Sequence, residues 1–393
     1  MDPVILVLNS GSSSIKFTLY SGDTVQLKGQ ISGLGAQPHI SLASRVSDTR
    51  VDRQLSADEG KSHGASLAAL LPVLEQELGG RSVDAVGHRV VHGGVTHTEP
   101  VCLTAEILED LKALEPLAPL HQPHNLAGIT AAREAFPEAM QVACFDTAFH
   151  RSHPWVNDTF ALPRPLYDEG VRRYGFHGLS YEYICSYLKQ AHPEIYKGRL
   201  VVAHLGNGAS MCAIREGQSI GSTMGFTALD GLPMGTRCGS IDPGAVLWLA
   251  AQGMSADEIQ SMLYGQSGLK GISGISSDMR ALLASDALRA RLAVDFYAYR
   301  AAQEIGKLAV TLGGLDALVF TAGIGANSPQ VRARICAQLT GLFGIVIDEA
   351  ANNANRQLVS HANSRVPVWA LQTDEEGMIA LSTARILRDN GGL

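Results

Sequence analysis

The first residues of the chain constrain its fold most, because they describe a buried hairpin with a polar tip. Val4–Leu8 is an uninterrupted apolar run, as in a strand buried on both faces. Asn9–Ser14 is small and hydrogen-bonding around Gly11, and apolar and polar residues then alternate over 15–20, which predicts a second strand. The tip offers backbone N–H groups, hydroxyls and one lysine, all donors to phosphate oxygens. The hairpin is therefore a candidate phosphate-binding element, although this stretch alone also fits an ordinary hairpin.

The same pattern recurs twice further along the chain. Residues 200–214 form two apolar runs around Gly206-Asn207-Gly208. Residues 317–328 form a third apolar run that enters a glycine-rich turn, where Ser328 and Pro329 are typical of a helix start. None of the turns is followed by the Gly-Lys-Ser/Thr of a P-loop, and none is the Gly-x-Gly-x-x-Gly of a dinucleotide fold. The repetition strengthens the prediction of a phosphate-binding fold of another kind.

Composition and charge exclude several classes of protein. The chain has 393 residues, of which 46% are hydrophobic and 18% charged, as expected for a globular protein with room for two domains. A net charge of −7 without a long Lys/Arg run argues against nucleic acid or an anionic membrane as partner. No apolar stretch reaches about 18 residues, and no signal-peptide pattern opens the sequence. The six cysteines form no Cys-x-x-Cys pair, so we expect reduced thiols and a cytoplasmic protein.

Periodicity and capping residues predict the elements between these turns. Helices are expected over 66–78, 104–114, 125–136, 180–190, 255–264, 276–312 with a break near residue 285, and from 374 to 388. Strands are expected over 83–91, 141–145 and 368–371. The segment 116–124 is expected to be non-helical because of its prolines. Thr373 and Glu376 predict a capping box for the last helix, and a domain boundary is expected near residue 150.

Six strings resemble the acetate kinase (acetokinase) family, in order and along essentially the whole chain. They are Asn9–Lys16, Gly87–Gly94, Phe145–His150, Arg173–Gly178, His204–Gly208 and Met234–Arg237. The resemblance implies an α/β fold of two duplicated ribonuclease-H-like (actin-like ATPase) domains, each a mixed sheet flanked by helices, with ATP in the cleft between them. It implies an N-terminal domain over 1–150 and a nucleotide-binding domain over 151–376, with the terminal helix 377–393 packing back on the first.

The resemblance also implies an activity. A member of this family transfers a phosphoryl group reversibly from ATP to acetate, giving acetyl phosphate and ADP, with magnesium or manganese and as a homodimer. Propionate or butyrate kinase of the same fold remains an alternative. From other classes, a nucleotide-switched binding ATPase should carry a separate peptide-binding region, and a hexokinase-like sugar kinase should line its cleft with polar residues.

Four residues carry the chemistry that the resemblance implies. Arg89 would hold the substrate carboxylate bidentately, and Arg237 would lie across the phosphoryl group in transfer. His177 would donate a hydrogen bond to the transition state, with His121 in a supporting role. Asp146 would act through the metal and its water or by orienting the nucleophile, since acetate is already ionised near neutral pH. The alternative for Arg89 and Arg237 is a structural arginine that pairs with a carboxylate. The alternative for His177 is a surface histidine in a turn.

Asn9 and Glu375 are the metal ligands that the resemblance implies. Mg²⁺ would complete its octahedral shell with waters and phosphate oxygens. An acidic residue in the first turn of a helix is also favourable simply because of the helix dipole, which is the alternative for Glu375.

The remaining site residues implied by the resemblance contact ATP or the methyl group of acetate. Ser12, Ser14 and Lys16 would face the terminal phosphates. Three segments would complete the ATP site: His204, Leu205, Gly206, Asn207 and Gly208; Asp278, Met279 and Arg280; Gly325, Ala326, Asn327, Ser328 and Pro329. The substrate pocket would comprise Arg89, Val91, Leu120, Phe176 and Ala228.

The chain departs from the family pattern at three of these places. Ala326 stands where a glutamate is expected, which leaves the nucleotide preference open. Asp374 replaces an asparagine before Glu375. Ala228 replaces a proline in the substrate pocket, and because alanine is smaller, we expect propionate to be used well with acetate still accepted.

Overall fold

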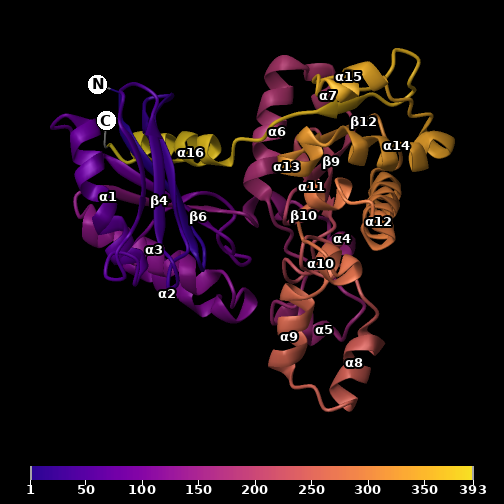
Figure 1. Cartoon of the computed structure of the whole chain (residues 1–393), viewed down its shortest axis with the longest axis horizontal. Coiled ribbons are helices and arrows are strands. Elements are labelled where there is room, and N and C mark those ends of the chain that lie inside the picture. Colours follow the sequence, from indigo (N-terminus) through magenta and orange to yellow (C-terminus); the bar gives the residue numbers. More distant parts are fainter. Residues whose placement is uncertain (1, 392–393) are drawn as a thin grey trace. The chain divides into compact units, whose positions relative to one another are not determined.

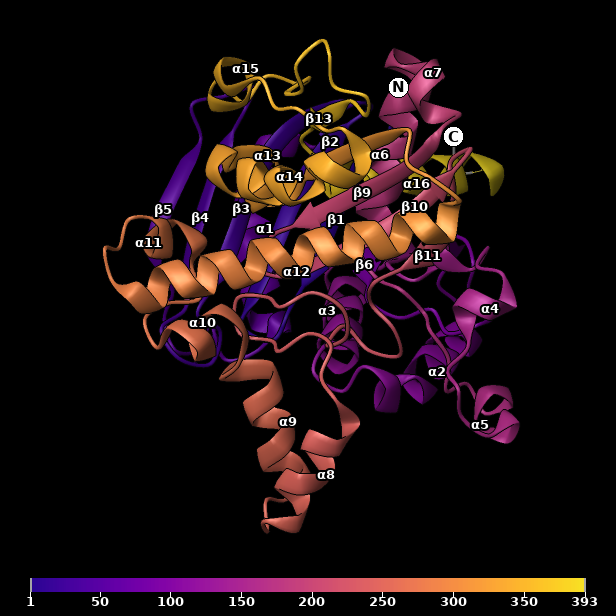
Figure 2. The same ribbon diagram turned by 90° about the vertical axis from the view of Figure 1, so that its right-hand side faces the viewer.

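The computed structural model describes residues 2–391 and divides into two compact units (Figures 1 and 2). Unit 1 comprises the chain up to Phe149 together with the segment from Asp374 onward, and unit 2 comprises His150–Thr373. The domains expected over 1–150 with 377–393 and over 151–376 remain a prediction, with boundaries close to those of the units. Within the described part of the chain, no helix combines the length and the apolar character needed to cross a membrane.

The described part of unit 1 is built on an eight-stranded mixed sheet in the order β5-β4-β3-β2-β1-β6-β8-β7. The strands are β1 (Val4–Ser10), β2 (Ser14–Ser21), β3 (Thr24–Ser32), β4 (His39–Ser44), β5 (Arg50–Gln54), β6 (Ala85–Val90), β7 (Val101–Cys102) and β8 (Met140–Phe145). β1 and β2 form the predicted antiparallel hairpin, while β1, β6 and β8 run parallel. The carboxyl ends of these three strands therefore meet at one edge of the sheet.

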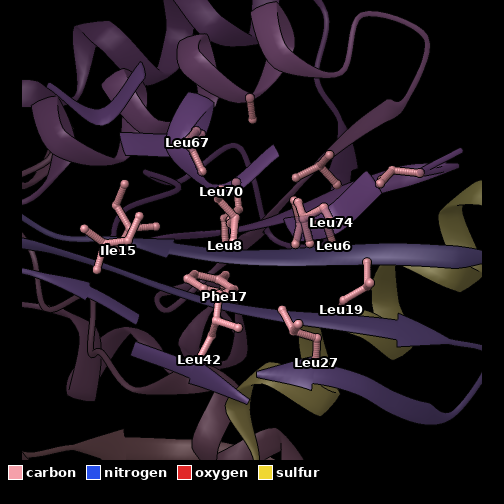
Figure 3. Packing of buried hydrophobic residues seen from close by; sticks show 14 of the residues in the cluster. Leu6, Leu8, Ile15, Phe17, Leu19, Leu27, Leu42, Leu67, Leu70 and Leu74 are labelled. Atoms are coloured by element: carbon pink, nitrogen blue, oxygen red, sulfur yellow. The ribbon is translucent and has the colours of Figure 1, made fainter. Parts of the chain in front are cut away.

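Helices cover both faces of this sheet. They are α1 (His63–Leu78), α2 (Ala105–Ala113), α3 (Gln122–Ala135) and α16 (Glu375–Asp389). Leu6 and Leu8 alternate with Ile5 and Val7 along β1, and they pack with Leu67, Leu70 and Leu74 of α1 (Figure 3). The residues between them face the other side, where α16 packs on β1, β6 and β8. The terminal helix thus belongs to unit 1, which explains why β1 is apolar on both faces.

Unit 2 has a five-stranded mixed sheet in its described residues, ordered β11-β10-β9-β12-β13. The strands are β9 (Arg199–Leu205), β10 (Ala209–Arg215), β11 (Gln218–Ser222), β12 (Ala317–Thr321) and β13 (Val368–Ala370). The longer helices are α6 (Gly178–Ala191), α8 (Pro243–Ala251), α9 (Ala256–Gly265), α12 (Leu288–Leu312) and α14 (Pro329–Phe343). The shorter helices are α4 (Trp155–Asp158), α5 (Arg164–Asp168), α7 (Pro193–Tyr196), α10 (Gly268–Ser273), α11 (Met279–Leu283), α13 (Ala322–Asn327) and α15 (Glu349–Asn353). α12 packs along β9, β10 and β11, and α13 packs on β9, β12 and β13.

Three local expectations differ from the structure. The segment expected to be non-helical over 116–124 enters α3 at Gln122, because Pro123 lies in the first turn, where a missing N–H costs nothing. The last helix is capped by Asp374, whose side chain accepts from the Gly377 N–H, so the predicted capping box is wrong. The third glycine turn is itself helical as α13, and Ser328 caps α14 without a side-chain hydrogen bond.

Candidate active site

Arg89 and Asp146 meet at the carboxyl edge of the unit 1 sheet. Arg89 lies in β6 and Asp146 directly follows β8, its parallel neighbour. Arg89 Nη2 donates to Asp146 Oδ2 over 2.6 Å, and Nε donates to the same carboxylate at 3.1–3.2 Å. The Asp146 side chain is only 2% exposed and that of Arg89 20%. A buried carboxylate therefore orients a guanidinium that reaches the surface.

Glu375 brings a second carboxylate to Arg89 from the distant end of the sequence. It is the first residue of α16, and its Oε2 lies 3.8 Å from Arg89 Nη1. The next residue, Glu376, accepts from Lys28 Nζ and Thr18 Oγ1, which ties the start of α16 to β2 and β3. Burial alone would lower the pKa of Arg89, but Asp146 and Glu375 outweigh it and raise that pKa. Arg89 therefore stays protonated at physiological pH.

The β1–β2 turn presents its polar groups as predicted for a phosphate site. Gly11 N–H donates to the Ser14 carbonyl over 2.8 Å, which closes the turn. Ser12 and Lys16 are exposed and Ser14 is half-buried. Asn9 is directly opposite Lys16 in the hairpin register, so their side chains lie on the same face. In the described structure the predicted phosphate donors of unit 1 thus share one short, ordered loop, which we call the phosphate turn (Asn9–Lys16).

Unit 2 collects His177, His204 and Arg237 around Gly208. The rings of the two histidines stack with centroids 4.2 Å apart and planes 12° from parallel. A Cβ at Gly208 would lie 3.4 Å from His177 Nε2 and 3.9 Å from Arg237 Nη1, so both side chains approach this glycine closely. His177 Nδ1 bonds Ser210 Oγ over 2.8 Å, and Nε2 lies on the side of the ring that faces Gly208. The arrangement places two potential donors, the His177 imidazole and the Arg237 guanidinium, beside Gly208.

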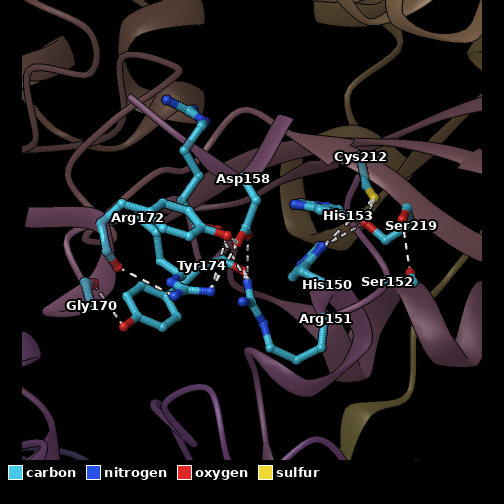
Figure 4. Close-up of polar contacts among 12 residues, drawn as sticks. His150, Arg151, Ser152, His153, Asp158, Gly170, Arg172, Tyr174, Cys212 and Ser219 are labelled. Atoms are coloured by element: carbon cyan, nitrogen blue, oxygen red, sulfur yellow. Dashed lines mark hydrogen bonds and ion pairs between the residues drawn. The ribbon is translucent and has the colours of Figure 1, made fainter. Parts of the chain in front are cut away.

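A buried network fixes the turn that carries His177. His177 has φ 59°, a left-handed conformation that few non-glycine residues adopt. His150 Nε2 donates to the carbonyl of the preceding Phe176 over 2.9 Å. Because burial lowers the pKa of His150 to about 3, its ring is neutral and Nδ1 accepts from the Ser219 hydroxyl over 2.8 Å (Figure 4). The Phe176 carbonyl, which can only accept, thus selects the His150 tautomer that holds the turn.

A cavity of about 960 Å³ lies within unit 2, a volume suited to a nucleotide. It is lined by Gly206, Asn207, Ser277, Asp278, Met279, Arg280, Leu283, Ala284, Gly323, Ile324, Asn327, Ser328, Pro329 and Gln330. Eight of these are predicted ATP contacts. The other six lie next to them: Leu283 on α11, Gly323 and Ile324 on α13, Gln330 on α14, and Ser277 and Ala284 in the segments that flank α11. Their closeness in sequence to the predicted segments is the signal that could have found them.

Other predicted ATP contacts lie outside the lining of this cavity. Ala326 is 3% exposed and Gly325 is also buried, because both face the sheet side of α13. His204 and Leu205 end β9 and are buried, and Gly208 belongs to the histidine cluster described above. The α13 helix therefore presents Gly323, Ile324 and Asn327 to the cavity rather than Ala326.

Comparison with known proteins identifies the family of this chain. The acetokinase family model matches residues 4–381. The acetate kinase of Methylocella silvestris is 50% identical, over 98% of this chain and 98% of its own. The solved propionate kinase of Francisella tularensis has a TM-score of 0.89 at 36% identity, over 98% of this chain and 100% of that chain. Acetate kinase of Porphyromonas gingivalis has a TM-score of 0.87 at 36% identity, with the same coverage. The chain belongs to the acetokinase family.

These matches confirm the family predicted from the six strings, the mixed α/β fold class and the assignment of the chain as a kinase of the acetate kinase type. The acetokinase site residues themselves remain predictions, now with positions in the structure. Val91 is half-buried and Leu120 exposed in unit 1, while Phe176 is buried and Ala228 half-buried in unit 2. Arg237 Nη1 donates to the Ala228 carbonyl over 3.1 Å, so the predicted phosphoryl-contacting arginine and the substrate-pocket alanine touch.

The acetokinase donor set fits magnesium rather than a metal held by protein alone. Among residues 2–391, no group of three or more His, Cys, Asp or Glu side chains is arranged to hold a metal ion. Mg²⁺ is typically bound by one or two protein oxygens, waters and substrate phosphates. The Glu375 carboxylate and the Asn9 amide oxygen are donors of that kind, and Glu375 is 19% exposed at its side chain. Asp146 is already engaged by Arg89.

Proposed function

We propose that this acetokinase transfers the γ-phosphoryl group of ATP to the carboxylate of acetate, reversibly and with magnesium. The main support is the Arg89–Asp146–Glu375 cluster: a guanidinium aimed by a buried carboxylate at the edge where α/β enzymes bind ligands. Such a guanidinium matches the two oxygens of a carboxylate substrate. The volume of the cavity within unit 2, which suits a nucleotide, also supports this proposal.

The chemistry needs positioning and charge more than covalent help from the protein. An acetate oxygen forms a bond to the γ-phosphorus, and the bond from that phosphorus to the β–γ bridging oxygen breaks, so ADP leaves with the electron pair. Arg89 holds the attacking carboxylate and reduces its repulsion by the phosphate. Arg237 and His177 Nε2 donate to the phosphoryl oxygens. No proton is abstracted, because acetate is ionised at neutral pH.

A bound magnesium ion would supply positive charge that offsets the charge of the phosphates. Glu375 and Asn9 would hold it from unit 1. The phosphate turn contributes Ser12, Ser14 and the Lys16 ammonium as further donors. A cytoplasmic location also remains part of this proposal, favoured by six cysteines that are all free thiols.

A hydroxamate assay for acyl phosphate across acetate, propionate, butyrate and glucose tests the proposal. Acyl phosphate should form with acetate and ATP and should require magnesium. Steady hydrolysis of ATP without acyl phosphate would instead support a nucleotide-switched binding protein, and glucose-dependent ADP release would support a sugar kinase. A strong preference for propionate or butyrate would keep the mechanism and change the substrate.

Propionate is the second candidate substrate, because of Ala228 and the likeness to a propionate kinase. We expect propionate to be used well, and Ala228→Pro to shift preference toward acetate. One methylene accommodated in an apolar pocket is worth on the order of 1 kcal/mol, or several-fold in specificity. Arg237 donates its hydrogen bond to the backbone carbonyl of residue 228. Proline retains that carbonyl, so the substitution should not remove this hydrogen bond. The measurement is kcat/KM for both acids in both proteins, and an equal ratio in the two would show that residue 228 does not set substrate size.

A homodimer is the proposed assembly, supported by an exposed apolar surface on unit 2. Leu288, Leu292, Phe296 and Tyr299 recur at helical spacing along α12, and each is at least 42% exposed. On α8, which buries none of its residues, Leu247 and Trp248 are 71% and 60% exposed. Each of the two helices thus carries its own group of exposed apolar side chains, of the kind typical of protein interfaces.

We therefore expect Leu292→Asp combined with Trp248→Asp to halve the mass measured by light scattering. An aspartate that is buried against an apolar partner surface strongly destabilises the dimer. On the exposed face of a monomer, the same aspartate would have little effect. Val46→Asp, at an exposed apolar position of unit 1, is the matched control and should leave the mass unchanged. If the unmodified protein already has the mass of one chain at micromolar concentration, the proposed dimer is wrong.

A further inference from the structure

Asn125 connects two segments of the proposed site through one buried side chain. It lies in the first turns of α3 and is 5% exposed. Its Nδ2 donates to the Ser10 carbonyl over 2.7 Å, and its Oδ1 accepts from the Val91 N–H over 3.0 Å. Both ends of the amide are therefore used, one by the backbone at the end of β1 and the other by the backbone directly after β6.

These two backbone groups lie where β1 and β6 part. The parallel pairing of the two strands ends at Leu8 and His88. Beyond it, β1 leads through Ser10 into the phosphate turn, and β6 leads through Arg89 to Val91. The Asn125 amide takes the place of ladder hydrogen bonds between the diverging strand ends, so it sets the distance between the phosphate turn and the strand that carries Arg89.

The surroundings leave Asn125 little freedom. One turn further along α3, a Cβ at Gly128 would lie 2.2 Å from Ser10 Oγ, so the helix and β1 are in close contact. The other side of the phosphate turn is held by His63, whose Nε2 donates to the Gly11 carbonyl over 3.0 Å. The His63 ring stacks on His124 of α3, with centroids 6.0 Å apart. α1 and α3 thus hold the turn from both ends.

We propose that Asn125 is a positioning residue that holds the phosphate turn and the Arg89 strand in register for phosphoryl transfer. This inference rests on the proposed function, in which the phosphate turn binds the phosphates and the Arg89 strand binds the carboxylate. Displacement of reacting groups by about 1 Å costs about 10²-fold in rate, so one misplaced turn is enough to matter. Asn125 acts through the backbone and touches neither substrate.

Asn125→Leu removes both hydrogen bonds at similar volume and should lower kcat by about 10–10²-fold while raising KM for ATP and for acetate. Asn125→Asp separates the two bonds. Its carboxylate still accepts from the Val91 N–H but repels the Ser10 carbonyl, whereas the protonated acid donates to that carbonyl as asparagine does. Burial raises the pKa of such a carboxyl, so activity relative to wild type should increase as pH falls. The same ratio for Asn125→Leu should stay flat.

Gln122→Leu is the matched control, because Gln122 is a buried amide in the same turn that donates to the His92 and Leu111 carbonyls and not to the phosphate turn. It should lower Tm and leave KM for ATP unchanged. Hydrogen exchange of peptides covering 9–14 should accelerate in Asn125→Leu and not in the control.

Wild-type kcat and KM values in Asn125→Leu, or equal losses in Gln122→Leu, would overturn the positioning role. Should Asn125→Leu fail to fold, a pH-independent activity ratio in Asn125→Asp would overturn it as well. Absence of acyl phosphate formation by the unmodified protein would refute the proposed function instead, and the exchange measurement would still report on the bridge itself.

Discussion

Replacing Arg89 with alanine should lower kcat by about 10²–10⁵-fold, because an arginine that neutralises charge in phosphoryl transfer can contribute up to about 10⁵-fold in rate. The guanidinium is held by three hydrogen bonds to Asp146 and lies beside Glu375, so no other side chain can take over its position. Without it, attack by one anion on another proceeds next to two uncompensated carboxylates. The fall should therefore appear in kcat as well as in KM for acetate.

Loss of stability must be separated from loss of chemistry in this variant, because Asp146 is left buried without its ion-pair partner. Asp146→Asn alone retains Arg89 and shows what the carboxylate contributes to aiming it. Arg53→Ala breaks an exposed pair with Glu59 in the same unit and should leave kcat unchanged. Urea unfolding of all three variants provides the correction. Wild-type turnover in Arg89→Ala at unchanged stability would remove Arg89 from the mechanism.

Arg237→Ala should cause a loss of kcat of similar size, because the guanidinium is proposed to neutralise charge on the transferred phosphoryl group. Arg237 Nη1 donates to the Ala228 carbonyl and to Met234 Sδ. A variant that is stable and nearly inactive would therefore attribute the loss to the transferred phosphoryl group. Activity within a few-fold of wild type would contradict this role.

Glu375→Gln should greatly reduce activity and raise the magnesium concentration needed for half-maximal rate. The helix dipole by itself accounts for only about 0.3–1 kcal/mol of stability at this position. Asp374 still caps α16 in the variant, so the helix start is retained. Activity assays over a magnesium titration, with calorimetric Mn²⁺ binding in the presence of ADP, measure the effect.

Glu376→Gln is the control for Glu375, because Glu376 joins α16 to Lys28 and Thr18. It should lower stability without changing the magnesium requirement. If Glu375→Gln loses activity at an unchanged magnesium requirement, Glu375 acts by orienting Arg89 across 3.8 Å rather than by binding metal. Normal activity with slightly reduced stability would leave Glu375 as a residue that interacts only with the helix dipole.

Local sequence by itself determined the elements and the family of this chain. The β1–β2 hairpin, the Thr104 cap and the Ser255–Glu258 capping box follow from residues within a few positions of each other, and all three are present in the structure. Short-range rules of this kind work because caps, turns and the alternation of buried side chains depend on neighbours along the chain. The strings that carry the resemblance to the family are equally local.

Tertiary structure alone decided which of these residues meet. Arg89 and Asp146 are 57 positions apart and come together because β6 and β8 are parallel neighbours. Glu375 joins them because α16 covers a sheet face that the first strands leave apolar. Asn125 is 115 positions from Ser10, and no periodicity marks it as a bridge. Its role arises where two strands diverge and leave backbone groups that a buried side chain must satisfy, since unpaired buried N–H and C=O groups are costly.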